Sequence, residues 1–260
     1  MATEQIRFAI AAKQRNSTWA SALSRFLNKY FYFCMSLLIA AVVIYGFSHT
    51  VNDNLLHASP PRPWILWLHG AVFTAWLGFF IFQSALVRTH NVKLHRMTGW
   101  FGAALGVLMP VLGISTAIIM HRFFFIHFHS IAVQLPPTVA NTTFFSIQAL
   151  DILSFTFFFW LAIYWRTKPE YHRRLMLIAT CVLTSAAFGR MPMVSHMWFY
   201  AGVDALIFLG MVRDLIVNRK IHVVYRYSLP ALIVAQTFAV QIWFHHPGWW
   251  VKLSSAIILG

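Results

Sequence analysis

Charged residues are scarce in this sequence. Only 10% of its 260 residues are Asp, Glu, Lys or Arg, and 59% are hydrophobic. A typical soluble domain has about 25% charged residues and under about 50% apolar ones. The composition therefore excludes a large soluble domain and is typical of an integral membrane protein in contact with the lipid bilayer.

Cysteine pairs and the common nucleotide-binding and hydrolase motifs are also missing. The two cysteines, Cys34 and Cys181, both lie inside apolar runs, which argues against a disulfide framework or a zinc ribbon. The sequence has no GxxxxGK[ST] loop, no GxGxxG and no GxSxG motif. Its formal charge of +14 resides in short loops between apolar runs, so membrane topology explains it and we predict no nucleic-acid partner.

Long apolar runs follow one another from residue 30 onward. A helix needs about 20 residues to cross about 30 Å of hydrocarbon. The sequence predicts an all-α, polytopic transmembrane helix bundle of about seven spans, at 30–49, 63–87, 98–120, 144–165, 174–190, 197–217 and 227–244. Residues 1–29 are predicted to form a cytoplasmic basic amphipathic segment, 30–246 the transmembrane domain and 247–260 an outer interfacial tail.

The distribution of basic residues predicts the orientation of these spans. Sixteen of the 20 Lys and Arg residues fall in the segment 1–29 or in the loops at 88–96, 166–174 and 213–226. The four others lie in the alternate loops or in the tail. Because cytoplasmic loops are enriched in Lys and Arg, we expect a cytoplasmic N-terminus and an outer C-terminus in a bacterial inner membrane.

Two stretches resemble a family of bacterial multi-pass membrane proteins of about seven helices. They read PRPWILWLHG…FTAWLGFF…Q…LVR…LHRMTGW and HRRLMLIAT…GRMP…D…VRDL…IH. The resemblance covers roughly residues 60–225 and implies an architecture, not an activity. The matching polar positions are His69, Gln83, His95, Arg96, His172, Arg173, Arg190, Asp204, Asp214 and His222.

Two His-Arg pairs stand at the starts of the third and fifth predicted spans. His95 and His172 would lie at the same membrane depth, where two histidines on facing helices could be the axial ligands of a haem iron. Arg96, Arg173 and Arg174 would then pair with the haem propionates, and His69 would mark a second, outer site.

Such an arrangement resembles the transmembrane b-type cytochromes, although their histidines usually lie within the spans. The resemblance implies haem b as the cofactor and electron exchange with a quinone. We therefore predict a haem-binding redox protein.

Three other chemistries are compatible with the sequence. Thioether and imidazole groups suit Cu(I), and an outer-face copper site could form from Met191, Met193, His196 and His121. His90 and His95 have the spacing of one box of a two-iron hydroxylase. A small transporter would use the intramembrane carboxylates Asp151 and Asp204.

The main alternative to redox chemistry is a protein without a cofactor. Short loops and abundant aromatic residues also suit a non-enzymatic accessory or assembly subunit of a larger membrane complex. In that interpretation the His-Arg pairs only anchor helices. With or without a cofactor, we expect Arg190 and Asp204 to form a structural ion pair between adjacent helices.

Overall fold

A computed structural model describes residues 2–127, 142–194 and 198–260, with side chains in the first helix from Trp19 onward. The described residues form helices and connecting turns, without a β-strand. The elements are α1 (Ala2–Ser48), a π-helical turn η1 (Asn52–Leu56), α2 (Trp64–Arg88), α3 (Val92–His127), α5 (Phe145–Tyr164), α6 (Pro169–Val182), α7 (Ser185–Phe188), α8 (Phe199–Asn218), α9 (Val223–His245) and α10 (Gly248–Leu259).

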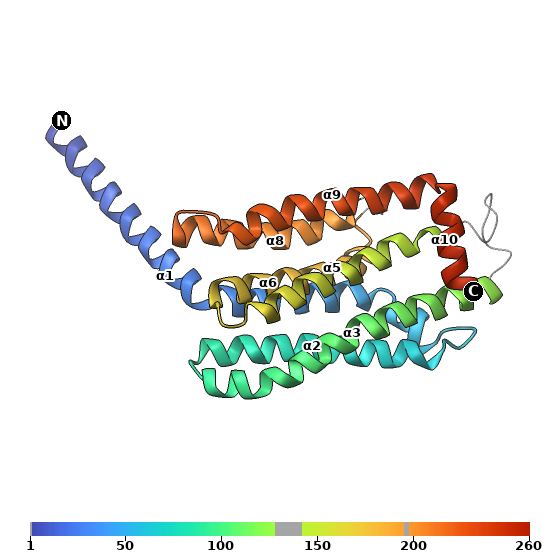
Figure 1. Cartoon of the computed structure of the whole chain (residues 1–260). Coiled ribbons are helices and arrows are strands. Elements are labelled where there is room, and N and C mark those ends of the chain that lie inside the picture. Colours follow the sequence, from blue (N-terminus) through green and yellow to red (C-terminus); the bar gives the residue numbers. More distant parts are fainter. Residues whose placement is uncertain (1, 128–141, 195–197) are drawn as a thin grey trace.

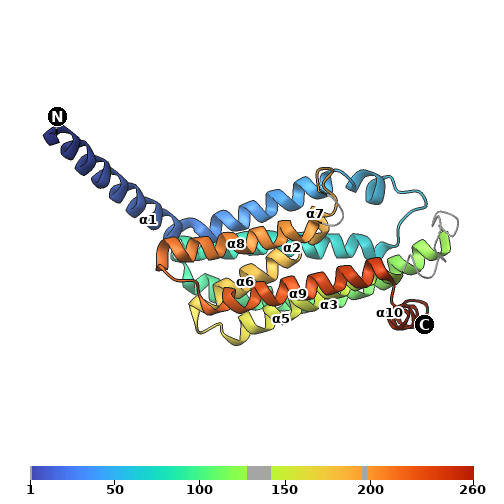
Figure 2. The same cartoon turned by 90° about the horizontal axis from the view of Figure 1, so that it is seen from above.

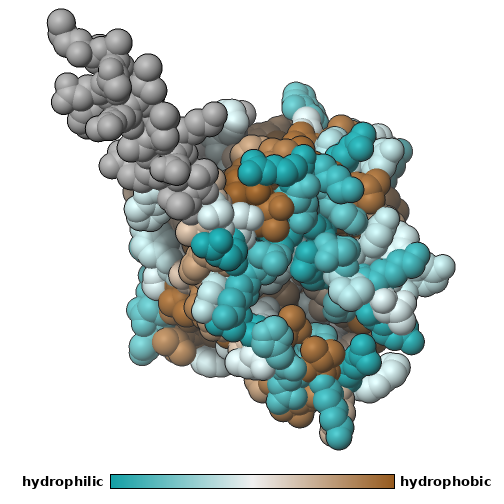
Figure 3. Space-filling model, turned by 90° about the vertical axis from the view of Figure 1, so that its left-hand side faces the viewer, coloured by the Kyte–Doolittle hydropathy of each residue, from teal (hydrophilic) through white to brown (hydrophobic). Residues whose placement is uncertain are grey.

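The longer helices run side by side as one bundle, from which the N-terminal part of α1 projects (Figures 1 and 2). The turns at 89–91, 165–168 and 219–222 all lie at the end of the bundle where α1 enters it, here called the basic end. Figure 3 views this end and shows a largely hydrophilic surface. The grouping of these basic turns at one end agrees with the alternation expected from the sequence.

Within the described residues, five helices are long and apolar enough to cross a membrane. They are Trp19–Ser48, Trp64–Arg88, Val92–His127, Phe145–Tyr164 and Val223–His245. The predictions of an all-helical protein and of membrane-spanning helices are therefore confirmed, and the chain is an integral membrane protein in contact with lipid.

The fifth predicted span, 174–190, is not one continuous helix. It consists of α6 and the short α7, which are separated at Leu183 and Thr184. At the break, the Thr184 N–H and hydroxyl both donate to the Cys181 carbonyl, at 2.9 and 2.6 Å, in the tighter i→i−3 pattern. Hydropathy alone does not register this break, because both residues sit within an otherwise apolar run.

Aromatic rings fill the centre of the bundle. Phe155 and Phe159 of α5 stack with ring centres 5.6 Å apart, and Trp76 of α2 packs edge-on against Phe155 at 5.2 Å. All three are buried. Many large apolar side chains point outward instead, among them Ile44, Trp100, Val111, Leu153, Phe157 and Val234. An apolar exterior around an apolar core is what contact with hydrocarbon requires.

The terminal segments differ in how they join the bundle. Helix α1 continues without a break through residue 29, so the predicted amphipathic segment and the first span share one helix. At the other terminus, α10 packs back against α3 and α5, where Ile258 contacts Ala117 and Phe145. The predicted outer tail is therefore a docked helix.

Candidate functional site

The structure brings His95 and His172 together at the basic end. His95 lies in the first turn of α3 and His172 in the first turn of α6, which begins at Pro169. Proline suits this first helical position because it has no N–H to satisfy. The two imidazole centres are 6.3 Å apart and their planes are inclined by 75°. We call these two residues the histidine pair.

The orientation of His172 is set by a backbone contact. Its Nδ1 donates a hydrogen bond to the Ala162 carbonyl of α5, 2.9 Å away. A carbonyl only accepts, so the proton sits on Nδ1 and the Nε2 lone pair is left free. A hydrogen bond of this kind commonly orients a metal-ligating histidine. Across from it, the buried Nδ1 of His95 has no hydrogen-bond partner among the described residues.

The separation of the two rings suits a shared iron. Two imidazoles on one metal have ring centres roughly 6 Å apart, because each metal–nitrogen bond is about 2 Å and each ring centre lies about 1 Å beyond its nitrogen. Within the described residues no group of three or more His, Cys, Asp or Glu could hold a metal ion. A haem needs only two ligands from the protein, which is the number that the histidine pair offers.

The predicted propionate partners occupy different surroundings. Arg96 is exposed. Arg173 is half-buried: its Nη2 donates to Glu170 at 2.6 Å, and its guanidinium lies over the Tyr32 ring. The Nε of Arg173 has no partner within the described parts of the chain. Arg173 therefore keeps a free donor, whereas Arg174 does not.

Arg174 forms a buried ion pair with Asp214 of α8. Its Nε and Nη2 donate to the two carboxylate oxygens at 2.9 and 2.5 Å, and both side chains are fully buried. A third contact joins Arg174 Nη1 to Glu170 at 2.6 Å. Arg213 extends the network, because it donates to Asp214 at 3.0 Å and to Asn28 of α1 at 2.9 Å. The network fastens α1, α6 and α8 together, so Arg174 acts as a structural residue.

Sequence reasoning identified a different ion pair. Among the described residues, Arg190 and Asp204 are not an ion pair. Arg190 follows α7, where its Nη1 donates to the Ala186 carbonyl at 2.6 Å and its guanidinium lies over Phe47. Arg174 and Asp214 are oppositely charged residues next to apolar runs, and this pattern in the sequence could have indicated the observed pair.

Glu170 and His222 at the basic end both have shifted pKa values. Burial raises the pKa of the Glu170 carboxyl, but Arg174 and Arg173 outweigh burial and hold that pKa below its usual range. Burial lowers the pKa of His222, and the positive charge of Arg174 lowers it further. Glu170 is therefore ionised and His222 neutral near pH 7.

The residues of the predicted outer sites that the structure describes have contacts of their own. His69 stacks on Phe73 of its own helix with ring centres 3.9 Å apart. His121 pairs with Gln148, with 2.7 Å between the two side-chain atoms. For the predicted copper site, Met191 lies just after α7 and Met193 is 92% exposed. The remaining copper ligand, His196, lies outside the described residues.

The carboxylate Asp151 has partners on two other helices. The Ser185 hydroxyl of α7 and the Tyr200 hydroxyl of α8 both donate to it, the latter at 2.9 Å. Asp151 thus serves a structural contact among α5, α7 and α8. This contact lies toward the opposite end of the bundle from the histidine pair.

No protein-family model, curated protein or solved structure matches this chain.

Proposed function

We propose that this protein is a haem b-binding redox protein whose iron is held between His95 and His172, with a quinone as its electron partner. The observation that carries the proposal is the separation of 6.3 Å between two imidazoles from different helices. The haem would supply one-electron transfer at its iron. The chain's own residues would hold and orient it within the bundle.

Each residue of the site has a distinct role in this proposal. The Ala162 carbonyl holds the proton of His172 on Nδ1 and leaves Nε2 as the nitrogen that would bind the iron. His95 would supply the second nitrogen. Arg173, through its unpartnered Nε, and the exposed Arg96 are the donors available to the propionates. Because the site lies in a membrane bundle, a lipid-soluble quinone is the electron partner that we propose.

The bundle also supports our proposal of seven spans. Besides the five helices that meet the length and hydropathy requirements, α8 and the α6–α7 pair run alongside them (Figure 2). Helix α8 carries three charged residues, Asp204, Arg213 and Asp214. Arg213 and Asp214 are buried in the ion network, so they need not contact lipid. Seven crossings place the two termini on opposite sides of the membrane.

Substitution of the histidine pair tests the haem proposal. The wild-type chain and the variants His95→Ala, His172→Ala and His245→Ala would be produced with ample haem and purified in mild detergent. His245 is an exposed histidine at the end of α9 and serves as the matched control. We expect haem bound to the wild type and to His245→Ala, and at least tenfold less haem in the other two variants. Equal haem content in all four proteins would contradict the assignment of the ligands.

A further inference from the structure

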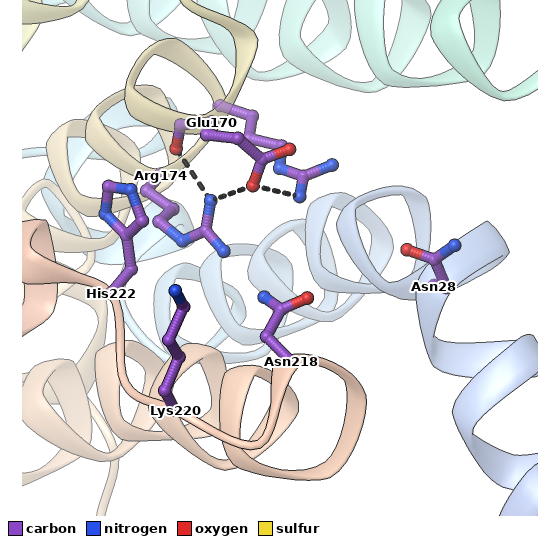
Figure 4. Close-up of a pocket in the computed structure, with 7 residues that line it drawn as sticks. Asn28, Glu170, Arg174, Asn218, Lys220 and His222 are labelled. Atoms are coloured by element: carbon purple, nitrogen blue, oxygen red, sulfur yellow. Dashed lines mark hydrogen bonds and ion pairs between the residues drawn. The ribbon is translucent and has the colours of Figure 1, made fainter.

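A pocket of about 480 Å³ opens at the basic end, between α1, α6 and the turn after α8. Figure 4 shows the side chains that surround it. The lining residues are Asn28, Glu170, Arg173, Arg174, Asn218, Lys220 and His222. Three permanent cations and one carboxylate thus face the same space, which favours a negatively charged occupant.

Most of these charges are already neutralised inside the protein. Arg174 is saturated by Asp214 and Glu170, and the latter also binds Arg173. Lys220, in contrast, is exposed and has no ion pair among the described residues. The net excess of positive charge in the pocket therefore resides mainly at Lys220.

Free hydrogen-bond donors point to the same conclusion. The amide oxygen of Asn28 accepts from Arg213, which leaves the amide nitrogen as a donor. This amide and the Lys220 ammonium come from α1 and from the turn after α8. Donors on two sides of one space match an anion with several oxygen atoms, such as phosphate.

One face of α1 at this end of the bundle is apolar. Trp19, Leu23 and Phe26 are between 48% and 71% exposed. They follow an i, i+4, i+7 spacing and so share one face of α1, about 180° around the helix from Asn28. A face of this kind suits the boundary between headgroups and acyl chains. The helix that contributes Asn28 to the pocket therefore carries an interfacial face on its other side.

We propose that this pocket binds the phosphate group of an anionic phospholipid headgroup at the membrane surface. Lys220 provides the main charge, and Asn28 provides a directed hydrogen bond. The same phosphate chemistry could come from soluble inorganic phosphate. The proposal does not rest on haem binding, because Lys220 does not contribute to the histidine pair.

Calorimetric titration of the full-length protein in a neutral maltoside detergent tests this proposal. The probes are short-chain phosphatidylglycerol, short-chain phosphatidylcholine and inorganic phosphate. Lys220→Gln is the test variant, and Lys252→Gln on α10 is the matched control. Both lysines are exposed, so neither change should disturb folding, which thermal unfolding would verify.

We expect saturable binding of phosphatidylglycerol in preference to phosphatidylcholine. Lys220→Gln should weaken it about tenfold, since a hydrogen bond to a charged group is lost, and Lys252→Gln should leave it unchanged. Saturable binding of inorganic phosphate with the same dependence on Lys220 would support the site and identify a soluble ligand. The proposal is overturned if neither anion binds saturably, if phosphatidylcholine binds equally well, or if both variants weaken binding alike.

Discussion

Arg174 and Asp214 are both fully buried, and each is the other's principal partner. Removing one member of a buried pair leaves an uncompensated charge, which typically costs about 3–5 kcal/mol. We therefore expect Arg174→Met to lower the free energy of unfolding by about that amount. Denaturant unfolding in detergent would measure it. Arg166→Met, at an exposed arginine of the neighbouring turn, should have little effect, and similar losses in both variants would contradict the assignment.

His222 makes the stability of the basic end depend on pH. It precedes α9, where its Nδ1 accepts a hydrogen bond from the Val224 N–H at 3.3 Å. Only the neutral imidazole can accept this bond. Burial lowers the pKa of His222 in the folded protein below the ordinary value of 6.5. The stability that the neutral His222 contributes to the folded protein is therefore complete above pH 6.5. It is lost as the pH falls through the folded-state pKa of His222.

The variant His222→Asn isolates this effect. Asparagine at the N-cap can still accept a hydrogen bond from the helix, but it does not titrate. Melting temperatures measured between pH 7.5 and pH 5 should fall less steeply for the variant than for the wild type. Parallel curves would show that the titration of His222 does not contribute.

Helix packing at single glycines gives a test at the level of elements. A Cβ added at Gly46 of α1 would collide with the backbone of Ala187 in α7, which no side-chain rotation can relieve. We expect Gly46→Ala to destabilise the protein by about 1–3 kcal/mol, the usual cost of overpacking. Gly70→Ala is the matched control, because nothing lies within 4 Å of its added Cβ. Thermal unfolding should give a lower melting temperature for Gly46→Ala than for Gly70→Ala. Equal melting temperatures would contradict the close contact of α1 with α7.

The helices themselves could largely be predicted from hydropathy. Each of the five spanning helices overlaps one of the predicted apolar runs. Their ends are harder to predict, because α3 begins at Val92 and continues to His127, well beyond the predicted 98–120. The break at Leu183 and Thr184 also escaped prediction, since the i→i−3 hydrogen bonds of Thr184 leave hydropathy unchanged. Local polar contacts of this kind depend on geometry that a sequence pattern does not contain.

The sequence predicted some side-chain contacts between helices and missed others. The repeated His-Arg motif indicated that His95 and His172 should face each other, and their rings do lie together. The same motif gave no reason to separate Arg173 from Arg174, although both bind Glu170 and only Arg174 also reaches the buried Asp214. Consecutive residues on a helix diverge by about 100°, so neighbours in sequence acquire different partners. Only the packed structure shows which direction is buried.

At the scale of the whole molecule, the account predicts a membrane topology. A reporter that fluoresces only in the cytoplasm should be bright when fused within the turn at 165–168. It should be dark when fused after residue 260. Alkaline phosphatase, which is active only outside the cytoplasm, should give the opposite pattern. Fluorescence at both positions would contradict seven spans, because three crossings, α6–α7, α8 and α9, then separate the turn from the tail.

The haem proposal depends most directly on the visible spectrum of the wild-type protein, purified in mild detergent and produced with ample haem. The spectrum would be recorded after oxidation in air and again after reduction with dithionite. Our account predicts a Soret band, with α and β bands that sharpen on reduction as two histidines hold a low-spin iron. A spectrum without these bands would contradict haem binding by His95 and His172, and would instead favour a non-enzymatic subunit of a membrane complex.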